Sequence, residues 1–134
     1  MSKPSSMILS VLKTQCPHCR EGFLFKHNNP YNLSKPILDM HDHCPVCNQL
    51  TEIETGFWWG TGYVSYALSI AVSVATVIAF SLFVGWKADY SFLWYLIANA
   101  LILVLAVPYL VRLSRTIWMS FFVYYDPNWR QEKN

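Results

Sequence analysis

Two Cys-x-x-Cys pairs are the residues of this chain best suited to chemistry. The first pair is Cys16 and Cys19, and the second is Cys44 and Cys47. Each pair lets two thiolates face one ion, and two pairs brought together supply the closed tetrahedral shell of a structural zinc site. Metal binding supplies much of the folding free energy of such small modules. The spacing therefore predicts a zinc-ribbon or knuckle domain within residues 1–55.

Other interpretations of the four cysteines differ in the group that they hold. A c-type haem requires Cys-x-x-Cys-His, whereas Arg20 and Asn48 follow the two pairs, so haem attachment is excluded. A thioredoxin-like dithiol requires a surrounding strand and helix pattern, and the duplicated pair argues against it. Rubredoxin-type iron uses much the same four-thiolate spacing, and the ligand set alone does not separate iron from zinc. We predict Zn²⁺, with iron as the alternative.

The residues around the two pairs do not indicate a catalytic centre. A closed shell of four cysteines has no open coordination position, which argues against metal-assisted hydrolysis. His18, His41 and His43 lie near the pairs in the sequence, and we expect them to face solvent. No nucleophile and base stand out elsewhere. The sequence therefore predicts a protein that is not an enzyme and has no small-molecule substrate.

The segment between the pairs must fold back to bring them together. An apolar run at residues 23–25 is followed by turn-forming runs at 28–30 and 34–36, and then by an apolar pair at 37–38. Such a succession is typical of short strands joined by turns. We therefore expect a small ribbon of strands between the two pairs.

The second half of the chain has the composition of a membrane protein. The chain has 134 residues, of which 54% are hydrophobic, and only Lys87 and Asp89 are charged within residues 61–111. Residues 61–86 and 92–111 are each uncharged and reach the roughly 20 residues that a helix needs to cross a bilayer. Residues 56–111 therefore predict a hairpin of two transmembrane helices in an α-helical membrane protein.

The distribution of basic residues predicts the orientation of this hairpin. Segments on the cytoplasmic side carry an excess of lysine and arginine, so both termini are expected in the cytoplasm. The reducing cytoplasm also favours a metal site over disulfides. The net charge of +2 is too small to indicate a nucleic-acid partner. One basic residue, Lys87, lies between the spans, and the other nine lie outside them: Lys3, Lys13, Arg20, Lys26, Lys35, Arg112, Arg115, Arg130 and Lys133.

Aromatic residues cluster at the ends of the predicted hairpin. Tryptophan and tyrosine favour the membrane interface because their rings are amphipathic. We therefore expect these side chains to lie at the level of the lipid headgroups. The first interface has Trp58, Trp59 and Tyr63, and the second has Trp86, Tyr90, Trp94 and Tyr95.

The first predicted span has two ladders of small residues, each with a spacing of four. Because the ladders are offset by two residues, they lie on opposite faces of a helix. Small residues allow close approach of helices, so one face could receive the second span and the other a partner or a second copy. The alternative is that alanine and serine are simply common in membrane helices. The ladders are Ala67, Ala71, Ala75 and Ala79, and Ser65, Ser69 and Ser73.

Polar and helix-breaking residues shape the second span and the C-terminal segment after it. Asn99 lies near the middle of the span, where we predict a structural hydrogen bond to a serine or threonine of the first span. Pro108 predicts a kink. The apolar stretch after Arg115 is too short for a third span. Residues 112–134 are therefore predicted to form a cytoplasmic tail with an extended or interfacial helix.

Taken together, these motifs resemble a bacterial membrane family catalogued as domain of unknown function 983. The shared features are CPHC followed by EGFLF, then CPVC, then ETGFWWGTGYVSYAL leading into the first span. The resemblance implies a metal role for the four cysteines and a bacterial cytoplasmic (inner) membrane location. Members usually have glycine after each pair, so Asn48 is expected to fit a left-handed backbone better than Arg20.

The resemblance implies no established activity, although some family members are encoded beside genes for assembling haem-copper respiratory oxidases. We therefore expect a non-catalytic zinc-binding membrane protein that is an interaction or accessory subunit of a larger membrane complex. The alternative is a metal- or redox-linked assembly factor for a respiratory haem-copper oxidase. The expected partners are the lipid bilayer and either another membrane protein or a second copy. A small transporter would need more charged or broken-helix features.

Overall fold

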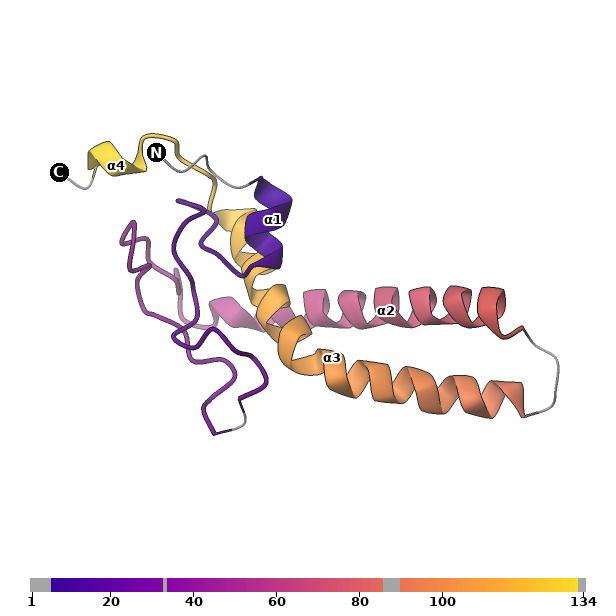
Figure 1. Ribbon diagram of the computed structural model, residues 1–134. Helices are drawn as coiled ribbons and strands as arrows, with labels where there is room; N and C mark the ends of the chain where they lie inside the picture. Colours follow the sequence, from indigo (N-terminus) through magenta and orange to yellow (C-terminus); the bar gives the residue numbers. More distant parts are fainter. Residues whose placement is uncertain (1–5, 33, 86–89, 133–134) are drawn as a thin grey trace.

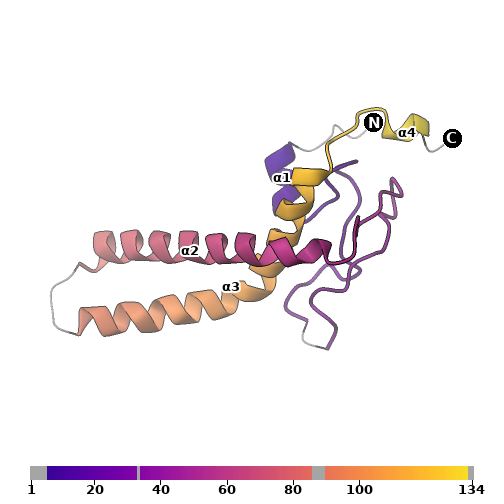
Figure 2. The same cartoon turned by 180° about the vertical axis from the view of Figure 1, so that it is seen from behind.

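The computed structural model describes residues 6–32, 34–85 and 90–132, and it is mostly helical. Two long helices lie side by side as a hairpin, and the cysteine-containing segment gathers at the end of the hairpin that holds both termini (Figures 1 and 2). The elements in chain order are α1 (Met7–Leu12), the 3-10 helix η1 (Phe57–Gly60), α2 (Thr61–Phe83), α3 (Ser91–Phe122) and α4 (Trp129–Glu132).

Helices α2 and α3 are both long and apolar enough to cross a membrane. Helix α2 ends at Phe83, three residues before the predicted end of the first span. The reason is local, because Gly85 adopts a φ of 72° and its N–H donates to the carbonyl of Phe80 at 3.1 Å. A left-handed glycine of this kind terminates a helix. The predicted interface residue Trp86 and the basic residue Lys87 lie outside the described residues, as do Lys3 and Lys133.

Helix α3 continues well past the predicted end of the second span at residue 111. It reaches Phe122 without interruption and contains Pro108, so residues 112–122 extend this helix. A proline has no N–H to donate to the carbonyl four residues earlier, here that of Val104, and this loss favours bending. Both views show that α3 bends, and its C-terminal half turns across the end of the hairpin (Figures 1 and 2).

The described part of residues 13–56, which contains both cysteine pairs, forms a ribbon without regular strands. No strand occurs within residues 6–32, 34–85 and 90–132, so the predicted short strands are wrong. Pro30 and Pro36 interrupt this segment and cannot donate to a ladder of hydrogen bonds. Three isolated antiparallel bridges hold the ribbon together instead: Gln15 with Phe23, Phe25 with Met40, and His43 with Leu50.

The ribbon joins α2 through a glycine that lies against an aromatic ring. A Cβ built at Gly60 would overlap the ring of Trp118, which belongs to the C-terminal half of α3. The Trp118 indole Nε1–H donates to the carbonyl of Phe57 at 2.8 Å. The Phe57 ring also meets that of Phe122 edge-on, with 5.2 Å between centroids. The GFWWG motif therefore fixes where α3 crosses the start of α2.

We expect the Gly60→Ala substitution to destabilise the protein by about 1–3 kcal/mol, because the added methyl group must displace the Trp118 ring. The measurement is thermal unfolding in mild detergent. Gly62→Ala is the matched control, since a Cβ at Gly62 would meet nothing within 4 Å. That control should be neutral or slightly stabilising, because alanine favours a helix over glycine. Equal melting temperatures for the two variants would contradict this account of the crossing.

Candidate metal centre

The structure brings the four predicted cysteines together as one site. Their Sγ atoms all lie within 4.8 Å of one another. The Sγ atoms of Cys16 and Cys47 are 3.8 Å apart, as are those of Cys19 and Cys44. A zinc–sulfur distance of about 2.3 Å in a tetrahedron gives sulfur–sulfur distances of about 3.8 Å, whereas a disulfide bond is about 2.05 Å long. The four thiols are therefore free and spaced to hold one tetrahedral ion.

The two Cys-x-x-Cys segments, each termed a knuckle, have matching backbone turns. The Arg20 N–H donates to the carbonyl of Cys16 at 2.8 Å, and the Asn48 N–H donates to that of Cys44 at 2.9 Å. Both donors have a left-handed backbone, with φ of 57° at Arg20 and 62° at Asn48. Arg20 therefore adopts the same left-handed conformation as Asn48, although an arginine is less suited to it. Its guanidinium lies 4.1 Å from the centroid of the Tyr125 ring, and this cation–π contact offsets part of the strain.

A buried glycine supports the site from behind. The Gly22 N–H donates to the Sγ of Cys19 at 3.4 Å, and its carbonyl accepts from the N–H of Cys16 at 2.7 Å. A Cβ added at Gly22 would lie 2.5 Å from the Sγ of Cys44. The position therefore requires glycine because the chain passes directly against a thiol.

We expect Gly22→Ala to weaken metal binding by about 10–100-fold, the usual effect of disturbing groups that orient metal ligands. The added methyl group must push the Cys44 thiol away from the other three. Competition with a chromogenic chelator measures the affinity. Gly62→Ala, on the open side of α2, should leave it unchanged. Unaltered affinity in Gly22→Ala would show that this contact does not position the thiol.

The thiols influence one another's protonation. A hydrogen bond with Cys16 lowers the pKa of Cys44 to about 7, whereas a hydrogen bond with Cys19 raises the pKa of Cys16. The ligand form of cysteine is the thiolate, so metal binding must release protons from the remaining thiols. Metal affinity is therefore expected to fall as the pH is lowered.

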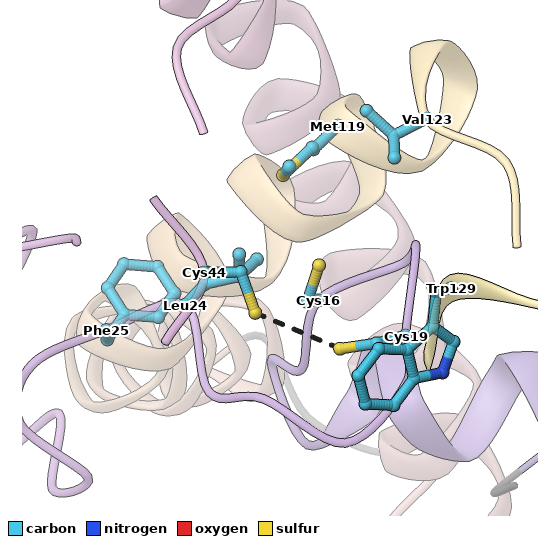
Figure 3. Close-up of a cluster of buried hydrophobic side chains, with 8 residues drawn as sticks. All are labelled: Cys16, Cys19, Leu24, Phe25, Cys44, Met119, Val123 and Trp129. Atoms are coloured by element: carbon cyan, nitrogen blue, oxygen red, sulfur yellow. Dashed lines mark hydrogen bonds between the residues drawn. The ribbon is translucent and has the colours of Figure 1, made fainter. Parts of the chain in front are cut away.

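Apolar side chains from the C-terminal part of the chain pack around the cysteines. The buried cluster that contains three of the thiols also includes Met119 of α3, Val123 directly after α3, and Trp129 of α4 (Figure 3). The tail is also tied to the first knuckle, because Arg130 pairs with Glu21 at 2.7 Å. Sequence reasoning did not include these residues in the site. The available signal was Trp129, a large apolar residue in an otherwise polar tail.

The ribbon is fixed on α3 by Arg112, which sequence reasoning used only for orientation. Its side chain is buried, with 2% exposure. Nε donates to the carbonyl of Ile37 at 2.8 Å, and Nη1 donates to that of His27 at 2.7 Å. The guanidinium also lies over the Phe25 ring, 4.8 Å from its centroid. These contacts join the ribbon that carries the four cysteines to the helical hairpin.

The three histidines near the cysteines differ in exposure. His43 is exposed and His41 is half-buried. His18 is half-buried, and its Nδ1 atom is buried without a hydrogen-bond partner among the described residues. His18, His43 and the half-buried ligand Cys47 line a cavity of about 760 Å³ beside the metal centre. The four-cysteine site is therefore accessible from the side of this cavity.

The two small-residue ladders lie on different faces of α2. The alanine ladder (Ala67, Ala71, Ala75 and Ala79) is exposed, whereas the serine ladder (Ser65, Ser69 and Ser73) is half-buried. The hydroxyl of Tyr95 in α3 reaches the carbonyl of Ser73 at 3.5 Å. Tyr95 is buried against α2, although we expected it at a membrane interface. The serine face is therefore the face that meets the second helix.

Asn99 lies in α3 and its Oδ1 atom is buried without a hydrogen-bond partner among the described residues. The predicted bond to a serine or threonine of α2 is therefore not formed within that part of the chain. Two hydroxyls of α2 near this position bond within their own helix. Ser69 donates to the carbonyl of Ser65 at 2.9 Å, and Thr76 donates to that of Val72 at 2.8 Å.

The fold and the site define a helical-hairpin protein with a cluster of four cysteines suited to a tetrahedral metal ion. Comparisons of the chain with protein-family models, curated proteins and solved structures give no match. The resemblance to the family of domain of unknown function 983 therefore stays a prediction.

Proposed function

We propose that this chain is a zinc-binding integral membrane protein that acts, without catalysis, as an interaction or accessory subunit of a larger membrane complex. The observation that carries the proposal is the attachment of the cysteine module to one end of an apolar hairpin through Arg112. A metal-stabilised module held in this way presents a fixed surface beside the membrane.

Membrane insertion is supported by the exposed apolar surface of the hairpin. No residue of α2 is buried, and Leu82 and Phe83 are 77% and 88% exposed. Exposure of apolar area to water is unfavourable by about 25 cal/mol per Å², whereas lipid would surround it favourably. The core helices of a soluble protein would be mostly buried. We propose that the two helices span the cytoplasmic membrane of a bacterium with both termini in the cytoplasm.

A structural role for the metal is supported by the closed ligand shell. Four thiolates fill a tetrahedral ion completely and leave no position for a substrate or an activated water. The same shell suits zinc and iron, and zinc is the proposed ion because it is the usual occupant of two Cys-x-x-Cys pairs in a ribbon.

A partner surface is supported by the exposed alanine ladder of α2. Ala71 and Ala75 lie on the face of α2 that does not meet α3. Small residues on a membrane helix let another backbone approach closely. The partner is either another membrane protein or a second copy of this chain.

The test is purification in mild detergent, followed by identification of co-purifying proteins, mass determination and elemental analysis. We expect a stoichiometric partner or a dimer, and about one zinc per chain. The double substitution Ala71→Leu, Ala75→Leu should abolish the association by steric overlap. Ala100→Leu, at an exposed alanine of α3, is the matched control and should retain it. A monodisperse monomer without any partner would overturn the proposal.

A metal-linked assembly factor for a haem-copper oxidase is the second candidate, and one observation favours it. Cys47 is the least buried ligand and lines the cavity of about 760 Å³ with His18 and His43, so an incoming thiol or imidazole could reach the ion. This function requires fast metal exchange, measured with isotopically labelled zinc, and loss of oxidase activity on deletion of the gene. Exchange over days, with normal oxidase activity, would exclude it.

A further inference from the structure

A second cavity, of about 410 Å³, lies where α1 ends beside the bend of α3. It is separate from the cavity beside the metal centre, and no residue lines both. Lys13, Asn28, Tyr109 and Arg112 are among the residues of its wall, and no acidic residue is among the described residues that line it. The wall therefore has two cations and no compensating anion.

Arg112 lines this cavity, and one nitrogen of its guanidinium is unused in hydrogen bonds among the described residues. Its Nε and Nη1 atoms donate to carbonyls of the ribbon, whereas Nη2 has no hydrogen-bond partner among the described residues. No carboxylate pairs with Arg112 in the described part of the chain. A buried charge without a counter-charge is strongly unfavourable. An anion bound in the cavity would supply that counter-charge.

The second cation, Lys13, lies across the cavity at the end of α1. The Tyr109 hydroxyl donates to the carbonyl of Leu12 at 2.8 Å and so ties the end of α1 to α3. Lys13 directly follows Leu12, and Arg112 lies one turn after Tyr109 in α3, so this bond brings both cations to the wall of the same cavity. An arginine with a free edge beside a long-chain lysine suits a phosphate group, which accepts charge-assisted hydrogen bonds from both.

The position of the cavity indicates the source of the phosphate. Helix α1 lies on the side of bent α3 that faces the hairpin (Figures 1 and 2). Its apolar side chains Met7, Ile8 and Leu9 are exposed, with Ile8 at 74%. Such a short apolar helix beside a hairpin is suited to lie at the membrane surface. The cavity would then open at the level of the lipid headgroups.

We propose that this cavity binds the phosphate of an anionic phospholipid headgroup, held by Arg112 and Lys13. The inference rests on the membrane insertion proposed above. A bound lipid would fix the ribbon and α1 on the bilayer surface, since Arg112 contacts both the ribbon and the cavity.

The test is native mass spectrometry of the metal-loaded full chain in a non-ionic detergent, titrated with phosphatidylglycerol or with phosphatidylcholine of the same acyl chains. We expect phosphatidylglycerol to bind at least about tenfold more tightly. Lys13→Glu should lower its affinity about tenfold through loss of a charge-assisted hydrogen bond. Lys35→Glu, an exposed position outside the cavity wall with the same change in charge, should change it less than about twofold.

The outcomes separate this inference from the proposed function. Equal binding of the two lipids, or an equal loss in Lys13→Glu and Lys35→Glu, would overturn the lipid site while leaving membrane insertion intact. Displacement of phosphatidylglycerol by millimolar inorganic phosphate would assign the cavity to a soluble phosphate instead. Release of the protein from membranes by alkaline carbonate would overturn membrane insertion and the lipid site together.

Discussion

Cys16→Ser is expected to remove the bound metal and unfold the ribbon while leaving the helical hairpin formed. Cys16 is fully buried, and its Sγ is one of four ligand atoms within 4.8 Å of one another. The ribbon has three isolated bridges and no strand in the described residues, so it has little regular secondary structure to keep it folded once the metal is lost. Structural zinc sites contribute about 10–16 kcal/mol of binding free energy at neutral pH.

Three measurements check this expectation on the same purified protein. The metal content, measured by elemental analysis, should fall from about one ion per chain to nearly none. Hydrogen exchange should become fast in residues 13–56 and stay slow in the apolar parts of α2 and α3. The far-ultraviolet circular dichroism should change little, because most of the helical residues belong to the hairpin.

His43→Ala is the matched control for the cysteine substitution. His43 is exposed and immediately precedes a ligand cysteine, so it tests whether any change near the pair disturbs the metal. We expect full metal content and a folded ribbon. A Cys16→Ser protein that retains one equivalent of metal with unchanged hydrogen exchange would refute the four-cysteine site.

The features that could be predicted from the sequence are those determined by residue type over a short span. The four cysteines were identified because their side chains and spacing specify the chemistry without a fold. The two long helices were identified because uncharged stretches of about 20 residues are rare outside membranes. Both are local signals.

The role of the charges after the second span could not be predicted in this way, because they are used in long-range contacts. Arg112 and Arg115 follow the predicted span and lie inside α3, in the helical extension that was one of the two predicted arrangements. Arg112 meets carbonyls about 75 to 85 residues away in the sequence, and Arg115 lies over the ring of Trp58, 4.9 Å from its centroid. The sequence around these arginines does not show whether their side chains make such contacts or are exposed to solvent. Tyr95 was misplaced for the same reason, because its partner Ser73 belongs to another helix.

The prediction of strands in the ribbon was wrong because contacts among the four cysteines, and not a sheet, bring its ends together. Apolar runs and prolines at residues 23–38 favoured strands and turns, and only the turns are present. A strand needs a continuous neighbour, and here each bridge joins a single pair of residues. The backbone hydrogen bonds nearest the cysteines are instead those of the two turns that end at Arg20 and Asn48.

Arg112→Leu is expected to separate the folded ribbon from α3, with a loss of about 3 kcal/mol in the stability of their contact. Leucine removes the donors to Ile37 and His27 and leaves two partly buried carbonyls without these partners, and a fully buried orphan carbonyl is unfavourable by about 1–3 kcal/mol. Removal of a buried cation returns part of this free energy, because the charge no longer has to be desolvated. The net change in stability is a loss, because leucine has no donor for the two carbonyls.

The measurement is hydrogen exchange of residues 23–40 in the metal-loaded protein, which should accelerate about hundredfold while the metal content is unchanged. Arg112→Lys retains the charge but has no planar fork to reach two carbonyls at once, so it should show an intermediate effect. Arg115→Leu is the matched control on the same helix, because the Arg115 side chain contacts the soft Met40 sulfur at 3.4 Å and the Trp58 ring. If Arg115→Leu accelerates exchange as much as Arg112→Leu, the ribbon is held by general packing on α3 and the two carbonyl bonds are not what attaches it.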